Sequence, residues 1–247
     1  MPFKHLPLLE RMESFYQLPR DRQRFDTYLD VLIGPDREDV VLPIASFNPM
    51  GKDLVLEKIK ELRAVDAETL IQTTVEYVNA NWAALTNDVY TVALNLVDDI
   101  GGAWSNKYTT DYTSKFDQAG MAKRHFCLPV FFTSENYDAT LVRERVLEYL
   151  YRTIHWLHLG KPETLQQHLD QEIFVQRHVK SYKDLTFDPE ELQMMERLLT
   201  QQGPENSDYN TIFNFFYGDS ACELLNYPCY GVPEMAGFRY AAYLAEE

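Results

Sequence analysis

Histidine and carboxylate side chains that could ligate a metal ion are concentrated in the second half of the chain. Glu148 and His155 are seven residues apart, so a helix places them on one face, and His158 follows one turn later. His168 and Glu172 are four residues apart and share a face of the next expected helix. Two such helices packed side by side direct imidazoles and carboxylates at one point, as carboxylate-bridged metal bundles do. These five residues are therefore a candidate site for a divalent metal.

The same residues also have an ordinary structural interpretation. Neither a Glu-x-x-His nor a His-Glu-x-x-His spacing occurs, although these spacings are the usual signatures of helical metal sites. Without a metal, the helices of 138–178 have polar outer faces, and His155 or His158 is half-buried beside Trp156 and hydrogen-bonded. The sequence leaves both interpretations open.

A second candidate site is the stretch from 98 to 116, which reads DDIGGAWSNKYTTDYTSKF. It combines paired carboxylates, a lysine, an asparagine and several aromatic residues. As a long loop it would hold aromatic and polar groups together, which is typical of a ligand site. The candidate ligand-binding residues are Asp98, Asp99, Trp104, Asn106, Lys107, Tyr108 and Asp111.

The alternative for this stretch is a helix that simply packs. Its aromatic residues recur every four positions from Trp104 to Phe116, so in a helix they form one row. Against the helix stand Thr109, Thr110 and Thr113, because β-branching restricts χ1 and lowers helix propensity. The threonines favour the loop.

The segment from Ser46 to Asp53, SFNPMGKD, is a candidate for a phosphate-binding loop, but it lacks residues that such a loop requires. A Walker A loop needs glycine at the position of Ser46 and serine or threonine at the position of Asp53. Pro49 also removes one of the backbone N–H groups that would bind phosphate. The segment fits a helix entry better, so no nucleotide cofactor is expected.

No residue has the surroundings of a catalytic nucleophile. Ser134 lacks the flanking glycines of a nucleophile elbow, and Cys127 lies in an apolar run that raises a thiol pKa. Cys222 and Cys229 have no histidine near them in sequence. The sequence therefore does not decide whether the protein is an enzyme.

Charge and cysteine content restrict the partners and the compartment. The chain of 247 residues has a formal net charge of −15, which opposes binding to nucleic acid or to anionic membranes. Three cysteines outside any CxxC spacing indicate a reducing compartment, and no segment approaches the ~20 apolar residues of a membrane span. We expect a soluble, acidic, cytoplasmic protein with neither nucleic acid nor membrane as a partner.

Apolar residues at steps of three and four predict helices along most of the chain. The longest such pattern runs from Ile71 to Leu96 and predicts one or two helices over 66–99. Short apolar runs at about 40–44 and 126–133 are the candidates for strands or extended segments. Further helices are expected near 6–15, 25–32, 54–62, 142–157, 162–178, 189–199 and from Pro233.

The expected fold class is mainly α. Only 10 glycines are present, which argues against a fold with many tight hairpins, and no change of composition marks a linker. Successive helices joined by short turns bury their apolar stripes against one another. We expect a single-domain, bundle-like array of helices over 1–247, with at most one or two short strands or extended segments.

Two functions remain open at this level. The first is a small-molecule pocket, with or without metal assistance, formed by residues 98–116 and the helices of 138–178, where ionisable groups lie next to aromatics. The alternative is a non-catalytic helical module whose acidic surface and exposed aromatics bind a partner protein or form a homo-oligomer.

Overall fold

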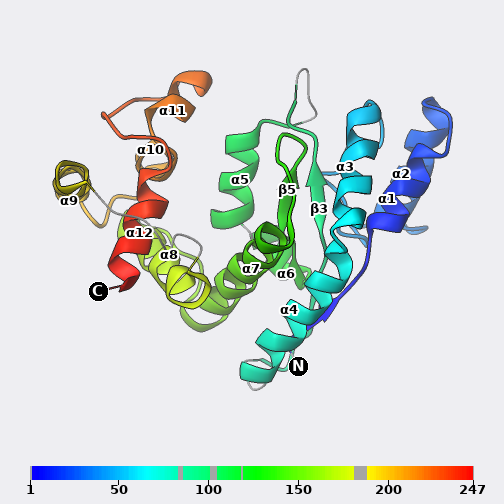
Figure 1. Cartoon of the computed structure of the whole chain (residues 1–247), viewed down its shortest axis with the longest axis horizontal. Coiled ribbons are helices and arrows are strands. Elements are labelled where there is room, and N and C mark those ends of the chain that lie inside the picture. The colour runs from blue at the N-terminus through cyan, green and yellow to red at the C-terminus, as the bar shows by residue number, and fades with distance from the viewer. Residues whose placement is uncertain (1, 83–85, 101–104, 118, 181–187, 247) are drawn as a thin grey trace. The chain divides into compact units, whose positions relative to one another are not determined.

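The computed structural model describes residues 2–82, 86–100, 105–117, 119–180 and 188–246 (Figure 1). Within these ranges the fold is mainly α, as the sequence predicts, with twelve helices and five short strands. The chain divides into two compact units, residues 1–150 and 151–247. The expectation of a single domain over 1–247 stays a prediction.

The first unit contains parallel strands. They are β1 (Phe3–His5), β2 (Tyr90–Val92), β3 (Asn95–Val97), β4 (Phe126–Cys127) and β5 (Val130–Phe132). β2 lies between β1 and β4, β3 pairs with β5, and each pairing is parallel. Between the short pairs, Ala93 N donates to Cys127 O at 3.2 Å and Asn95 N donates to Pro129 O at 2.9 Å. The runs 90–97 and 126–132 therefore lie side by side as two interrupted strands.

The strands in 90–97 correct the prediction of helix over 66–99. α4 (Ala67–Asn81) is helical as expected, but Val92 and Leu96 belong to β2 and β3. The helical pattern is misleading here because Val92, Leu94 and Leu96 are all 0% exposed, as is Ala93 between them. A strand buried on both faces reads as a continuous apolar run, which several periodicities fit.

The helices of the first unit confirm the remaining N-terminal predictions. α1 (Leu9–Tyr16), α2 (Arg22–Ile33) and α3 (Asp53–Ala64) match the helices expected near 6–15, 25–32 and 54–62. The Asp21 carboxylate accepts hydrogen bonds from two backbone N–H groups and so fixes the start of α2. After β3 follow α5 (Lys107–Phe116) and α6 (Ala119–Lys123), and after β5 follows α7 (Ala139–Leu159).

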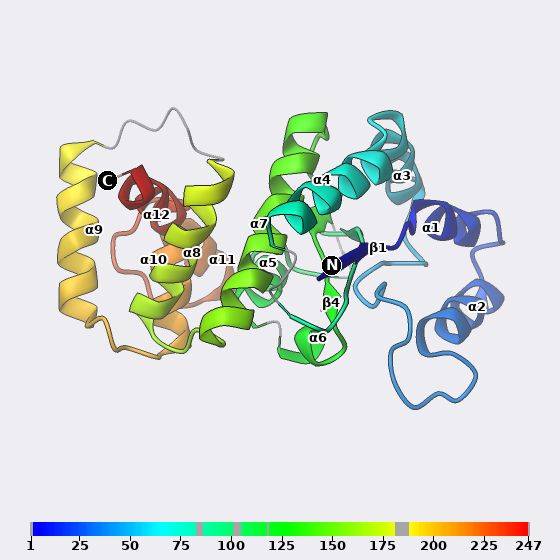
Figure 2. The ribbon, with the colours of Figure 1, turned by 90° about the horizontal axis from the view of Figure 1, so that it is seen from below.

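Helices lie on opposite sides of the β3–β5 pair. Figure 1 shows α5 on one side and α3 on the other, and Figure 2 gives the view from below. Ile59 of α3 and Phe131 of β5 are 0% exposed, so apolar side chains fill this core. At the sheet edge, the Asn79 side chain of α4 accepts from Phe3 N at 3.1 Å and donates to Phe3 O at 2.8 Å. This amide satisfies the outer backbone groups of β1 and protects the edge from further strand pairing.

The two runs expected to be strands or extended segments differ. The run 126–133 contains β4 and β5, which confirms the prediction, but residues 40–44 form no strand. Val41 N and Leu42 N both donate to Leu32 O of α2, at 2.8 and 3.2 Å, so the segment follows the end of that helix. Pro43 has no N–H to contribute to a ladder, which is consistent with this outcome.

The second unit is helical in its described residues. It contains the end of α7, α8 (Leu165–Val179), α9 (Pro189–Gln202), α10 (Tyr209–Tyr217), α11 (Asp219–Leu225) and α12 (Ala236–Glu246). Thr164 and Gln167 form a capping box at the start of α8. Asp188 caps α9, with Pro189 in its first turn, as predicted. α12 packs against α8, α9 and α10, so the last helix closes this unit.

Candidate ligand-binding cavity

The first unit contains a cavity of about 340 Å³ beside α5. Its wall is built by α5 and α6, by the β3–β5 pair and by the segment 40–46. The apolar part of the wall consists of Val40, Pro43, Ala45, Met121, Leu128 and Val130. Small-molecule sites are usually apolar cavities of ~300–1,000 Å³ with a few polar groups. This cavity therefore has the size and the lining of a site for a small ligand.

Asn95 is the buried polar residue of the wall. It lies at the start of β3 next to Val130, its register partner on β5, and both residues line the cavity. Asn95 is 3% exposed, and its Oδ1 has no hydrogen-bond partner among the described residues. Leaving such an acceptor unsatisfied costs about 1–3 kcal/mol. Asn95 therefore places an unsatisfied polar group inside the cavity wall.

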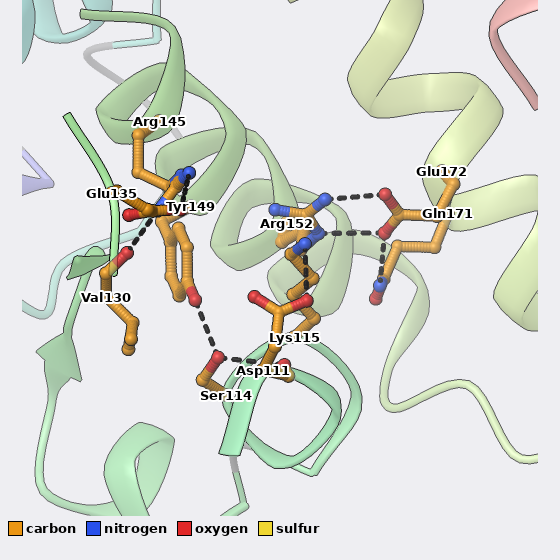
Figure 3. A network of polar contacts seen from close by, with 10 residues as sticks. All are labelled: Asp111, Ser114, Lys115, Val130, Glu135, Arg145, Tyr149, Arg152, Gln171 and Glu172. Atoms are coloured by element: carbon orange, nitrogen blue, oxygen red, sulfur yellow. Dashed lines mark hydrogen bonds and ion pairs between the residues drawn. The ribbon is translucent and has the colours of Figure 1, made fainter. Parts of the chain in front are cut away.

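α5 supplies hydroxyl groups to the cavity, from Thr109, Thr110, Thr113 and Ser114. The helix forms in spite of its threonines because the Asn106 side chain caps it, accepting from Thr109 N at 3.1 Å. Ser114 Oγ lies 2.6 Å from the Tyr149 hydroxyl of α7 (Figure 3). The side chains of Thr110 and Thr113 have no hydrogen bond with other described residues, so both hydroxyls are available to a ligand.

The segment 40–46 is fixed on two sides. Tyr28 of α2 donates its hydroxyl to Ile44 O at 2.9 Å, and burial raises the pKa of Tyr28 to about 12. At the other end, Arg124 Nη2 lies 2.6 Å from Asp39 Oδ1, and Arg124 Nη1 donates to Gly120 O at 2.8 Å. The guanidinium holds the pKa of Asp39 below its ordinary value. These contacts connect the segment to α2 and α6 and so shape the cavity.

The candidate carboxylates Asp98 and Asp99 follow the carboxyl end of β3. Asp98 is 9% exposed and accepts from Asn48 Nδ2 at 2.8 Å. Asp99 accepts from the backbone N–H of Ser134 at 3.0 Å and from its hydroxyl at 2.6 Å. Thr133 Oγ1 also donates to Asp99 at 2.9 Å. Both carboxylates tie the end of β3 to neighbouring segments, and neither is among the residues described as lining the cavity.

The other candidates of 98–116 belong mostly to α5. Lys107 Nζ lies 3.4 Å from Ser134 Oγ, so it joins the group around Asp99. Asp111 forms a buried ion pair with Lys115 at 2.7 Å. Asn106 is the cap of α5, Tyr108 lies half-buried in its first turn, and Trp104 lies outside the described residues.

The loop interpretation of this stretch is wrong for residues 107–116, which are helical. Tyr112 and Phe116 are buried, as a packing row requires. The cavity lies beside the threonines of α5, whose β-branching favours a loop when the sequence alone is considered. The segment is helical in spite of the threonines because the Asn106 side chain caps it. The cap accepts a hydrogen bond from a backbone N–H of the first turn and so stabilises that turn.

The proposed metal ligand Glu172 is paired with an arginine instead. Arg152 of α7 donates from Nε to Glu172 Oε1 at 2.8 Å and from Nη2 to Oε2 at 2.5 Å (Figure 3). The two side chains are 1% and 0% exposed. Gln171 Nε2 donates to Glu172 Oε1 at 3.1 Å and Gln171 Oε1 accepts from Trp156 Nε1 at 2.6 Å. The carboxylate is thus neutralised by a cation that cannot be deprotonated in a protein.

The proposed metal-binding histidines have different environments. His155 is buried, its Nδ1 has no partner among the described residues, and burial lowers its pKa. Burial lowers the pKa of His168 to about 4. His158 is exposed, and Glu148 lies on α7 within the first unit. In the described part of the chain no three histidine, cysteine or carboxylate side chains are arranged to hold a metal ion. The structure therefore gives the metal hypothesis no support.

Sequence reasoning did not find Asn95 or Arg152. A polar amide inside the apolar run YTVALNLV is a usable signal for Asn95, because such a residue needs a buried partner. Arg152 stands in the similarly apolar YLYRTIHWL, where a charge implies an opposite charge on a neighbouring element.

Comparison with known proteins yields no relative: no family model, no curated protein and no solved structure matches the chain. Among the helices of the described residues, none has the length and apolar character needed to span a bilayer.

Proposed function

We propose that this protein binds a small molecule in the cavity beside α5. The observation that carries the proposal is the cavity wall, which combines apolar side chains with the hydroxyls of Thr110 and Thr113, and these hydroxyls bond to no other described residue. Apolar side chains supply contact area in such a site, and a few polar groups orient the ligand. Residues of 98–116, which the sequence predicts as one part of a pocket, line this cavity through α5. None of the described lining residues comes from the helices of 138–178, the other predicted part.

The proposal relies on hydrogen bonds and apolar contact. Among the described lining residues Asp117 is the one carboxylate, and no histidine or cysteine accompanies it. A divalent ion would need several such ligands converging on one point. The free state of Cys127, Cys222 and Cys229 supports the further proposal that the protein works in the reducing cytoplasm.

The alternative, a protein-interaction module, has less support. Among the described residues, the most exposed large apolar side chains are Leu159, Leu224 and Tyr77, at 75%, 70% and 60%, and they lie on three different helices. Single exposed apolar residues are normal on protein surfaces and do not mark an interface. These exposed side chains therefore do not favour this function over the cavity.

The test is a fragment screen on three forms of the full chain. Ligand-observed NMR with a library of small aromatic and aliphatic fragments is run on the wild type, on Thr113→Phe and on Thr73→Phe. Both threonines are exposed on helices, but Thr113 lines the cavity and Thr73 lies on α4 away from it. Phenylalanine at 113 adds bulk at the cavity, and the same change at 73 is the matched control.

We expect a set of fragments to bind the wild type and Thr73→Phe but not Thr113→Phe. Fragments that bind all three forms equally would place binding elsewhere. A library without any binder would contradict the proposal. Circular dichroism on each variant establishes that a loss of binding does not come from unfolding.

A further inference from the structure

We infer that Ser134 is the nucleophile of an acyl-transfer site at the carboxyl end of the β3–β5 pair, where the protein hydrolyses small neutral carboxylic esters. Asp99 is the general base of this site, and Lys107 stabilises the oxyanion. None of the three is among the described residues that line the cavity, so the inference does not depend on ligand binding there.

Ser134 and Asp99 occupy equivalent positions on two parallel strands. Val97 of β3 and Phe132 of β5 are register partners, and Asp99 and Ser134 each follow them by two residues. Ligand sites of parallel sheets lie at the carboxyl ends of the strands. Ser134 is exposed in the turn between β5 and α7, and a turn from strand to helix is also where hydrolases with a nucleophile elbow hold their serine. Ser134 has this position without the flanking glycines of the elbow.

The Ser134 hydroxyl is bonded to a carboxylate. Its Oγ donates to Asp99 Oδ2 at 2.6 Å, which is the short distance expected for a charged acceptor. The other oxygen, Oδ1, accepts from Ser134 N at 3.0 Å and from Thr133 Oγ1 at 2.9 Å, so the carboxylate is fixed in orientation. A carboxylate within hydrogen-bond reach of a hydroxyl is placed to take its proton. An adjacent base of this kind is what makes a serine nucleophilic.

The Lys107 ammonium supplies the positive charge of the site. Its Nζ lies 3.4 Å from Ser134 Oγ and 5.6 Å from the centre of the Phe132 ring. Lys107 forms no direct ion pair with another described residue, so Nζ is able to bond to a substrate. When Oγ attacks an ester, the carbonyl oxygen next to it becomes an oxyanion. Lys107 therefore lies where this negative charge develops.

The reaction consists of two balanced steps. In the first, Ser134 Oγ bonds to the carbonyl carbon and its proton passes to Asp99 Oδ2. The bond from this carbon to the alcohol oxygen then breaks, and the departing alcohol takes up the proton. In the second step, water attacks the acylated serine and gives a proton to Asp99 Oδ2. The bond to Oγ breaks, Oγ regains a proton, and the carboxylic acid leaves.

The charges of the site favour a neutral ester. A phosphate monoester or an anionic ester would approach Asp99, which touches the nucleophile, and the net charge of −15 repels it at longer range. A neutral ester gains negative charge only in the transition state, next to Lys107. Ile100 follows Asp99 in the chain and is 43% exposed, so it offers an apolar surface to the acyl group. The substrate class is therefore neutral esters of short apolar acids.

The first experiment labels the full chain with a fluorophosphonate, a reagent that phosphonylates activated serines. After digestion with trypsin, mass spectrometry follows the peptide 125–143, which contains Ser134. We expect the label on Ser134 in the wild type, and about 100-fold slower labelling in Asp99→Asn and in Lys107→Met. A wild type without label on Ser134 would overturn the inference. Equal labelling rates in the wild type and both variants would overturn it too, because the serine would then not be activated.

The second experiment measures the hydrolysis of p-nitrophenyl butyrate and p-nitrophenyl phosphate at pH 7. The wild type should hydrolyse the butyrate ester in preference to the phosphate. Ser134→Ala and Asp99→Asn should each lower kcat/KM for the ester about 100-fold. Ser14→Ala is the matched control, because Ser14 is also exposed but donates to Arg11 O at 2.7 Å instead of to a carboxylate. This control should keep the wild-type activity.

Two outcomes of the second experiment would contradict the inference. Ester hydrolysis that is equal in Ser134→Ala and the wild type would place the activity elsewhere, and preferred hydrolysis of the phosphate would overturn the substrate class. Circular dichroism on each variant separates loss of activity from unfolding, and labelling of the wild type decides the question where a variant does not fold. The fragment screen concerns the cavity alone, so its result leaves this test unaffected.

Discussion

The Arg152 guanidinium and the Glu172 carboxylate meet in a two-bonded ion pair, with both side chains almost completely buried. Their helices α7 and α8 are thereby held in one register, because the planar guanidinium fits the carboxylate in one orientation. The pair also explains how a carboxylate on an inner helix face is tolerated without a metal.

The first prediction concerns this pair. Arg152→Met leaves Glu172 buried and uncompensated, so the free energy of unfolding should fall by about 3–5 kcal/mol. The double variant Arg152→Met with Glu172→Leu removes both charges and should recover most of this loss. Urea unfolding followed by circular dichroism measures all three proteins. Arg22→Ala breaks an ion pair whose side chains are 92% and 55% exposed and serves as the control, with an expected change below about 1 kcal/mol.

The second prediction concerns pH. Burial lowers the pKa of His168 from its ordinary 6.5 to about 4, so between these values the unfolded chain binds a proton that the folded protein excludes. The free energy of unfolding is therefore unaffected by this histidine above pH 6.5. It falls by roughly 3 kcal/mol in total as the pH is lowered from 6.5 towards 4. Urea unfolding at half-unit pH steps should show this loss.

His168→Leu is the corresponding variant. It removes the titrating group, so the decline in the free energy of unfolding between pH 6.5 and 4 should become shallower. Burial also lowers the pKa of His155, so part of the decline should remain in this variant. An unchanged slope in His168→Leu would contradict the assignment.

The third prediction is that Asn95, a residue of the candidate site, lowers the free energy of unfolding. Asn95→Leu replaces an unsatisfied buried amide with an apolar side chain of the same branching, whose extra volume adjoins the cavity, so the free energy of unfolding should rise by about 1 kcal/mol. A thermal melt of the ligand-free protein should show a higher midpoint. Asn214 also has a buried Oδ1 without a partner, but its Nδ2 donates to Asp219 at 2.8 Å, so Asn214→Leu should destabilise and forms a matched contrast.

The fourth prediction compares two glycines. Gly218 and Gly160 both have positive φ, at +82° and +83°, but a Cβ at 218 would lie 2.3 Å from Pro233 O and one at 160 would meet nothing within 4 Å. Gly160→Ala should cost about 1–2 kcal/mol from backbone conformation alone. Gly218→Ala should cost about 2 kcal/mol more, because the backbone of 233–234 must move. Equal costs, measured by urea unfolding, would contradict the close contact.

Local signals in the sequence predicted much of the helical structure. Asp188 before Pro189 marks the start of α9, and a cap followed by proline depends on neighbouring residues alone. The order of the strands, in contrast, does not follow from neighbouring residues. Val92 and Leu96 continue a three-and-four pattern by chance, and both are buried in strands that pair with segments far away in the chain.

The cavity was beyond sequence reasoning for a related reason. Residues of α5 are site candidates from the sequence, but their threonines favour a loop, whereas in the structure they line the cavity from a helix. Asn95 is placed in the cavity wall by the register that sets it beside Val130, and residues of α5 line the same cavity. Such a role depends on pairings between segments far apart in the chain, and a residue pattern does not contain them.

The parallel pairing of β1 with β2 joins two strands that are synthesised at different times. β1 leaves the ribosome first, yet its partner begins at Tyr90, and the strand beyond that begins at Phe126. Throughout this interval Phe3, which is buried in the finished protein, has no sheet to join. The pairing of β1 is therefore a non-local contact, of the kind that slows folding.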